Sequence, residues 1–437
     1  MAEDLTRRTV LQAGFAAGIA IPLLAACSAS GSSSAGSGSA TVRFSSYGDP
    51  TKLGLRGSLA KTYMAAHPKV KMVFEGSATA DYWDKLATEM AGGNAPDVIN
   101  IDSVHIAEYA SKNALMALDK YIPKPIEIDT FTKTLVQLGQ LNGKQYGVPV
   151  ATSMYAWGYD QTVLDSLGIP LPDGSWTWDS YAVLANDIRK ASKESIYGSE
   201  DASGDEPTLQ IWLRTKGAEL YQGGQLAYSQ ANLEEWFNYW GSLRASGGII
   251  PADVASLSRY GDWPNSPMVT KKAPLGHIFT PNLAGGFQGL TKNTLKLALP
   301  PVDKAGDKTA TFANASSYLS MSTRVSDAAA AAEFINWFVN GQEAALTLRL
   351  ISGPPASSAG MDALLQSANL TDAEKAVLDF TKMALSQVES TPEPSPGGDV
   401  AVSALLLKAS QDIAFKKASV AEASKKFFSD AAKALSQ

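Results

Sequence analysis

The chain has 437 residues, of which 45% are hydrophobic and 18% are charged, and its formal net charge at neutral pH is −6. An acidic chain without a concentrated basic patch is unsuited to a nucleic-acid partner, because phosphate binding needs clustered lysine and arginine. A single cysteine excludes an intrachain disulfide, so stability must come from buried hydrophobic cores. The three histidines lie far apart in the sequence, and we expect neither a metal site nor a cofactor.

The first 40 residues have the pattern of an export leader followed by a tether. The pair Arg7 and Arg8 resembles a twin-arginine export signal, and the apolar stretch at 13–26 is too short to span a membrane. Leu24–Cys27 resembles a bacterial lipobox, whose cysteine carries lipid. We expect residues 1–26 to be a signal peptide and 27–40 to be a lipidated Cys27 with a flexible Ser/Gly/Ala tether.

This leader predicts a protein that is exported and lipid-anchored to the outer face of the cell membrane. Acyl chains on one cysteine can hold a protein at a membrane surface without a spanning helix. An uncleaved anchor helix, or cleavage at another position, is the alternative. No later apolar run approaches the ~20 residues that a membrane span needs.

The first half of the mature chain alternates strands with helices. Residues 41–45 alternate in polarity like a half-buried strand, and Tyr47–Pro50 then forms a turn. We expect a helix through Met64 and a second strand at 70–75. Trp83, Leu86, Ala87 and Met90 recur at helical spacing and predict a helix over 81–90.

Asp97–Asp102 is predicted to be a third strand, and the βαβα order up to this point favours a parallel sheet. A long extended run follows at 150–159, and a strand of that length can cross from one lobe to another. Thr177 can cap the next helix. Further helical segments lie at 331–339 and 400–435, the latter with a break near Lys417.

Several motifs occur in an order that resembles the family 1 extracellular solute-binding proteins of carbohydrate ABC transporters, which include maltose-binding and glycerol-phosphate-binding proteins. Together they cover most of the mature chain. These motifs are Gly92–Val98, Gly143–Pro149 with Tyr159–Asp160, Trp176–Asp179, and Ala331–Phe338 with Gly353–Pro355.

The resemblance implies an α/β, two-lobed periplasmic-binding-protein fold of type II, with a multi-strand hinge and a ligand held between the lobes. Ligand that contacts both lobes only when they are shut would favour the closed state. The expected first lobe comprises residues 41–151 and about 301–326, and the expected second lobe comprises 152–300 and about 327–437.

The resemblance also implies a function without catalysis, in which the protein captures a sugar or oligosaccharide and delivers it to the permease subunits of an ABC importer. We expect the protein to be a monomer. The phosphate-binding glycine loop of ATPases is absent from the sequence.

A sugar has apolar C–H faces and a rim of hydroxyl groups, so its site needs aromatic rings beside carboxylates and amides. Glu206, Gln210 and Trp212 lie before Gly217, in a region where members of the family often contribute aromatic residues. The other candidates lie at strand ends, lobe crossings and loops of the family pattern. These ligand-binding candidates are Tyr47, Asp49, Asp102, Ser103, Ser153, Tyr155, Gln210, Trp212, Trp263, Asn282, Asn314 and Asp399.

Structural roles remain open for several of these candidates. Asp49 can form a turn before Pro50, and Asp102 or Ser103 can cap a helix. Core packing competes with sugar stacking for the aromatic residues, and Trp263, in an irregular loop, is the least typical of a core. Ser153 replaces a carboxylate of some relatives.

Two other functional classes remain as alternatives. The same fold could bind a polyamine, a glycerophosphodiester, an iron complex or a peptide. A polyamine would need several carboxylates in the cleft, and a phosphodiester would need arginine or lysine at helix N-termini. A secreted glycosidase would need two carboxyl groups at catalytic separation, which the sequence does not reveal.

Overall fold

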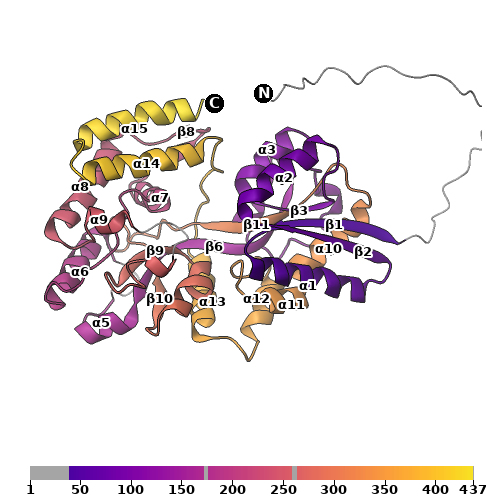
Figure 1. Ribbon diagram of the computed structural model, residues 1–437, viewed down its shortest axis with the longest axis horizontal. Helices are drawn as coiled ribbons and strands as arrows, with labels where there is room; N and C mark the ends of the chain where they lie inside the picture. The colour runs from indigo at the N-terminus through magenta and orange to yellow at the C-terminus, as the bar shows by residue number, and fades with distance from the viewer. Residues whose placement is uncertain (1–38, 172–175, 258–262, 437) are drawn as a thin grey trace, which may run out of the picture. The chain divides into compact units, whose positions relative to one another are not determined.

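A computed structural model gives the structure of residues 39–171, 176–257 and 263–436 (Figure 1). The expected signal peptide, Cys27 and nearly all of the tether lie outside these described residues. The strands are β1 (Ala40–Tyr47), β2 (Val70–Ser77), β3 (Val98–Ile101), β4 (Gln140–Leu141), β5 (Lys144–Gln145), β6 (Gly147–Asp160), β7 (Tyr221–Gln222), β8 (Gln225–Leu226), β9 (Leu275–Phe279), β10 (Leu295–Ala298) and β11 (Ala313–Met321).

Helices alternate with the strands and also form most of the second half of the chain. Short helical turns are η1 (Asp119–Tyr121), η2 (Trp263–Asn265), η3 (Leu283–Phe287) and η4 (Gln288–Leu290). The α-helices are α1 (Pro50–Ala66), α2 (Thr79–Ala91), α3 (Ser103–Ser111), α4 (Lys133–Gln137), α5 (Gln161–Leu167), α6 (Trp178–Ala191), α7 (Glu206–Thr215), α8 (Gln230–Ser246), α9 (Ala252–Ala255), α10 (Ala328–Asn340), α11 (Gln342–Leu348), α12 (Ser358–Leu365), α13 (Asp372–Leu385), α14 (Asp399–Ala414) and α15 (Val420–Ala434).

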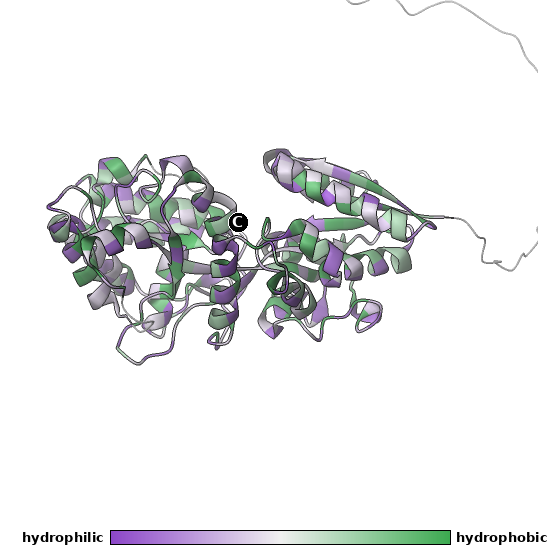
Figure 2. Cartoon of the chain, turned by 90° about the horizontal axis from the view of Figure 1, so that it is seen from below, coloured by the Kyte–Doolittle hydropathy of each residue, from purple (hydrophilic) through white to green (hydrophobic). Residues whose placement is uncertain are grey.

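Local sequence signals explain many of these boundaries. Thr177 caps α6 in a capping box with Ser180, as the sequence predicts. The predicted C-terminal helical segment is broken between α14 and α15, where Ser419 caps the second helix. Purple and green residues occur together along the helices in Figure 2, as expected for elements that bury one face. Within the described part of the chain, no helix is long and apolar enough to cross a membrane.

The main sheet has the strand order β10-β6-β11-β3-β1-β2, and β9 also pairs with β6. β1 is parallel to β2 and β3, because α1 and α2 return the chain to the same end of the sheet. β11 is antiparallel to β3 and β6. The expectation of a parallel sheet therefore holds for the first three strands only, because β11 enters from a distant part of the chain without a crossover helix.

β6 is the 14-residue strand that the extended sequence run predicts, and nearly all of it is buried. Its first part, residues 147–154, pairs with β11, and its second part, residues 155–159, pairs with β9. One strand thus connects two regions of the sheet that have separate hydrophobic cores.

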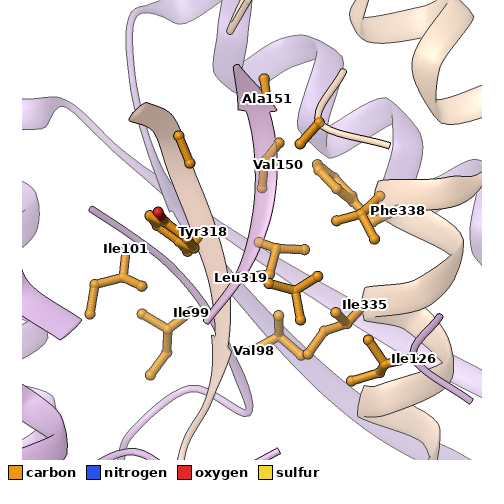
Figure 3. Close-up of a cluster of buried hydrophobic side chains, with 14 of the residues drawn as sticks. Val98, Ile99, Ile101, Ile126, Val150, Ala151, Tyr318, Leu319, Ile335 and Phe338 are labelled. Carbon is orange, nitrogen blue, oxygen red and sulfur yellow. The ribbon is translucent and has the colours of Figure 1, made fainter. Parts of the chain in front are cut away.

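The first core packs α10 against the strands of the main sheet (Figure 3). It includes Val98, Leu319, Ile335 and Phe338, all almost fully buried. We call the part of the chain around this core the first lobe.

The second core is rich in tryptophan and lies among β6, α6, α7 and α8. Trp157, Trp178, Trp212, Trp236 and Trp240 are at most 3% exposed. Trp178 and Trp212 have ring centroids 4.9 Å apart in an edge-on contact, a geometry worth about 0.5–1.5 kcal/mol beyond area burial. We call the part of the chain around this core, with a smaller cluster that includes Met268 and Leu283, the second lobe.

The expected lobe boundaries remain a prediction, and the packing revises one of them. Residues after about 327 were expected in the second lobe, but α10 contributes Ala331, Phe334 and Ile335 to the first core, and α11 contributes Ala344. The apolar face of α10 covers the sheet of the first lobe. α13 contributes to both regions, since Phe380 and Ala384 belong to the first core and Val377 belongs to the smaller cluster of the second lobe.

Asp97 connects β1 with the segment that follows β11, and its replacement by alanine should destabilise the protein. The buried carboxylate accepts hydrogen bonds from the backbone N–H groups of Arg43 and Ser326, both at 2.7 Å. Asp97→Ala leaves both donors unpaired and should lower the free energy of unfolding by about 2–5 kcal/mol in urea denaturation. Asp84→Ala, on the exposed face of α2, is the control and should change it by less than about 0.5 kcal/mol. Equal urea midpoints for the two variants would contradict this role.

Candidate functional site

A cavity of about 890 Å³ lies in the second lobe. Its wall comes from β6, β9, the start of α7, α14 and the loop region between α9 and β10. Aromatic rings and carboxyl groups share this wall, which includes Tyr155, Trp263, Phe279, Phe287 and Phe415 together with Glu200, Asp201, Asp205 and Glu206.

Tyr155, Trp263 and Asn282 are the predicted site residues that line this cavity. The Trp263 ring centroid lies 5.1 Å from that of Phe287. A Cβ atom at Gly286 would lie 2.9 Å from Trp263 Cδ1, so glycine allows the indole to lie against the backbone. The Asn282 Nδ2 atom is buried and has no hydrogen-bond partner among the described residues, so it is a donor that a ligand could use.

Asp205 and Glu200 place two carboxyl groups beside Tyr155. Asp205 caps α7, where it accepts hydrogen bonds from Thr208 N at 2.9 Å and from the Tyr155 hydroxyl at 2.6 Å. Glu200 accepts one from the Ser266 hydroxyl at 3.0 Å. Burial raises the pKa of both carboxyl groups, that of Glu200 to about 7 with a contribution from the charge of Asp205.

Glu206 and Asp399 form a carboxyl pair at the edge of the cavity. Asp399 begins α14 and accepts a hydrogen bond from the Tyr221 hydroxyl at 2.7 Å. Burial, and then repulsion from Asp399, raise the pKa of Glu206 well above its usual range. The Glu206 Oε2 atom is buried without a hydrogen-bond partner among the described residues.

His277 and Asp201 also line the cavity. His277 is uncharged, and the charge of Asp201 is balanced by an arginine. Burial lowers the pKa of His277 to about 3, so its imidazole is neutral at physiological pH. Asp201 accepts a hydrogen bond from Arg244 Nε at 3.0 Å and forms an ion pair with that side chain.

In the first lobe, the structure brings Tyr47 and Asp102 into one group with Trp83 and His105. The His105 ring stacks on Trp83 with centroids 3.7 Å apart, and Tyr47 lies 5.3 Å from Trp83. Asp102 caps α3 and contacts His105 Nδ1 at 2.7 Å. Trp83 is partly exposed, so this group offers an aromatic surface next to a carboxylate.

The remaining predicted residues have other surroundings. Asp49 is the exposed N-cap of α1 and accepts hydrogen bonds from Thr51 N and Lys52 N. Ser153 and Asn314 are partners in the β6–β11 ladder. Trp212 is part of the second core, Gln210 lies on α7 outside the cavity wall, and Ser103 begins α3 with a side chain outside the described residues.

Sequence reasoning missed Glu200, Asp205, Trp83 and His105. The helical spacing of Trp83 indicates a buried face, although its ring is partly exposed in the structure. Asp205 precedes Glu206 and Pro207 and could have been identified as a helix cap. Nothing around Glu200 in the sequence indicates that Ser266 and Asp205 lie beside it.

The arrangement has the chemistry of a binding site for a small polar molecule. Aromatic faces can cover C–H groups, and carboxyl and amide groups can orient hydroxyl or amino groups. Among the residues that the structure describes, no group of three or more metal-ligating side chains lies close enough together to hold a metal ion.

Comparison with known proteins gives a consistent picture. The family model of bacterial extracellular solute-binding proteins matches residues 58–376. A solved family 1 extracellular solute-binding protein from Alicyclobacillus acidocaldarius is 27% identical, with a TM-score of 0.78 and coverage of 92% of this chain and 99% of that one.

Two curated relatives match over shorter segments. A multiple sugar-binding protein of Streptococcus mutans is 22% identical over 56% of this chain and 55% of its own length. An uncharacterised lipoprotein of Streptomyces antibioticus is 26% identical over 46% of this chain and 44% of its own length. The chain thus spans about half the length of these curated relatives.

The raised pKa of Glu200 predicts that Glu200→Gln stabilises the unliganded protein at alkaline pH. A folded-state pKa of about 7, above the ordinary 4.5, means that the folded protein binds the proton more tightly than the unfolded chain. Ionisation of this carboxyl group therefore lowers the free energy of unfolding, and this loss is absent below about pH 4.5 and grows until the pH passes about 7.

Urea denaturation across this pH range measures the effect. Glu200→Gln should gain about 1–3 kcal/mol relative to wild type at pH 8 and almost nothing at pH 4. Glu127→Gln, at an exposed position, is the matched control. A stability difference that does not change with pH would show that Glu200 is not held in the protonated form.

Proposed function

The chain belongs to the bacterial extracellular solute-binding proteins, and from this premise we propose that it captures a sugar or oligosaccharide for the permease of an ABC importer. The observation that carries the proposal is the cavity of about 890 Å³ in which aromatic rings adjoin carboxyl groups. The volume is within the range of small-molecule sites, about 300–1,000 Å³. Its role is binding, with no chemical reaction.

In this proposal the cavity supplies the second-lobe half of the site. Trp263 covers an apolar face of the sugar, and the free Asn282 amide and the Glu206 carboxyl oxygen take up its hydroxyl groups. The multiple sugar-binding protein of Streptococcus mutans, a relative by sequence, supports a carbohydrate as the solute class.

The group of Tyr47, Trp83, Asp102 and His105 supplies the first-lobe half. Its stacked rings and its carboxylate repeat the chemistry of the cavity wall. Ligand bound to both surfaces would favour a closed arrangement of the lobes, since each surface alone offers only part of the contacts. The closed form would then dock on the permease.

We further propose that the protein is exported and anchored by lipid on Cys27, and that it acts as a monomer. The leader motifs support this, as does the similarity to a lipoprotein of Streptomyces antibioticus. In this proposal the pair Arg7 and Arg8 directs export of the folded chain by the twin-arginine route.

A non-sugar solute remains the second candidate, because the cavity contains the several carboxylates that a polyamine needs. A glycerophosphodiester is less favoured, because no lysine or arginine occurs among the described residues of the cavity wall. An iron complex, a peptide and a glycosidase activity have no comparable supporting observation.

Calorimetric titration of the purified protein with mono-, di- and oligosaccharides tests the proposal. Trp83→Ala and Trp263→Ala should each weaken binding of the recognised sugar by about tenfold or more, because each removes one stacking face. The thermal midpoints of both variants should stay within a few degrees of wild type.

Trp337→Ala is the matched control, because this partly buried tryptophan packs on Tyr63 and lies in neither proposed surface. Its affinity for the sugar should equal that of wild type. The proposal fails if no sugar binds, or if the sugar is cleaved at a rate proportional to protein concentration.

A further inference from the structure

The wall of the second-lobe cavity holds a cluster of carboxyl groups. Four acidic residues contribute to it, and no lysine or arginine does so within the described residues. Arg244 compensates Asp201 only. Glu200, Asp205 and Glu206 form no ion pair with a lysine or arginine among the described residues.

These three carboxyl groups also act on one another. Burial is the main cause that raises the pKa of Glu200 and of Glu206; the charge of Asp205 raises both further, and Asp399 also raises that of Glu206. The groups that face them are Asp201, the neutral His277 on β9, Asp399 and Ser403 on α14, and the hydroxyls of Tyr155, Thr208, Ser266, Tyr221 and Tyr228. No described neighbour brings a positive charge to the cluster.

We propose that this cavity binds a protonated amino group, so that the preferred cargo is an amino sugar. The inference rests on the proposed sugar-binding function and specifies its substrate class. An ammonium group offers three N–H donors and a positive charge, whereas a hydroxyl offers one donor and no charge. Charge-assisted hydrogen bonds are about twice as strong as neutral ones, and the difference grows in a buried site.

The aromatic part of the wall is compatible with such a cargo. Trp263 and Phe287 lie in contact, and Phe279 and Phe415 belong to the same wall. Aromatic faces attract cations and also cover the C–H groups of a sugar ring. The buried, unpartnered Oε2 atom of Glu206 is the acceptor that we assign to the ammonium group.

Proton release distinguishes this mode of binding from hydroxyl recognition. An ammonium ion beside Glu200 and Glu206 favours their ionised forms, so binding should expel protons and strengthen as the pH rises toward neutrality. A neutral sugar has no charge with which to displace these protons.

The test is calorimetric titration of the full chain with three matched sugars, glucosamine oligomers, their N-acetyl forms and the corresponding glucose oligomers, with spermidine as a fourth ligand. Titration in two buffers of different ionisation enthalpy reports the protons released. We expect the amino form to bind about tenfold or more tightly than both neutral forms, with proton release. Glu206→Gln should remove most of this preference, because an amide carries no charge for the ammonium group, and it should weaken the amino form far more than the neutral sugars. Glu127→Gln, at an exposed position, should change nothing.

The outcomes separate this inference from the proposed function. Equal binding of amino and neutral sugars, or binding of neutral sugars alone, would overturn the inference and leave the sugar-binding function intact. Binding of spermidine without any sugar would support the amine site and overturn the proposed sugar function. Absence of binding by every amine would overturn the inference. Glu200→Gln, which also removes a carboxyl group from the cavity wall, should reduce the same preference and provides a second variant, so that misfolding of Glu206→Gln would not prevent the test.

Discussion

The pairing of β6 with β11 is the constraint on which the rest of the structure depends. β6 contributes Val148 to the first core and Trp157 to the second. Phe312, just before β11, belongs to the second core, and Leu319, in β11, belongs to the first. Irregular register interrupts the ladder near Ser317, and such bulges bend and twist strands. Because β6 lies in both cores and the chain passes from the second core into the first as it enters β11, a change in the angle between the lobes must be absorbed where these two segments cross.

The second lobe combines two features that oppose each other energetically. Its aromatic core stabilises the fold, and the adjoining cavity buries carboxyl groups whose ionised forms are disfavoured there. Such an arrangement costs stability in the unliganded protein, and a ligand that supplies donors or positive charge recovers it. Perturbed pKa values in a concave site are typical of functional residues. The carboxyl cluster therefore connects the energetics of this lobe to its proposed role in binding.

Periodicity and capping were sufficient to predict the early strands and helices, the long strand β6 and the break before α15, because these depend on local sequence. The antiparallel direction of β11 and the packing of α10 in the first lobe could not be predicted, since both depend on contacts between residues distant in the chain. The site shows the same division. The irregular loop around Trp263 indicated a position outside the core, and Trp263 does line the cavity. Nothing comparable marks Glu200, because Ser266 and Asp205 come close to it only in the folded protein.

Closure of the lobes around ligand is the central claim, and a distance measurement between spin labels tests it most directly. Asp84 on α2 and Asp253 on α9 are exposed and lie beside the two proposed binding surfaces, so Asp84→Cys and Asp253→Cys provide the labelling sites. Cys27→Ser removes the native cysteine, so that only these two sites are labelled. We predict that the recognised ligand shortens and narrows the distance distribution, and that Trp263→Ala prevents this at the same ligand concentration. An unchanged distribution under conditions where calorimetry shows saturation would contradict the account.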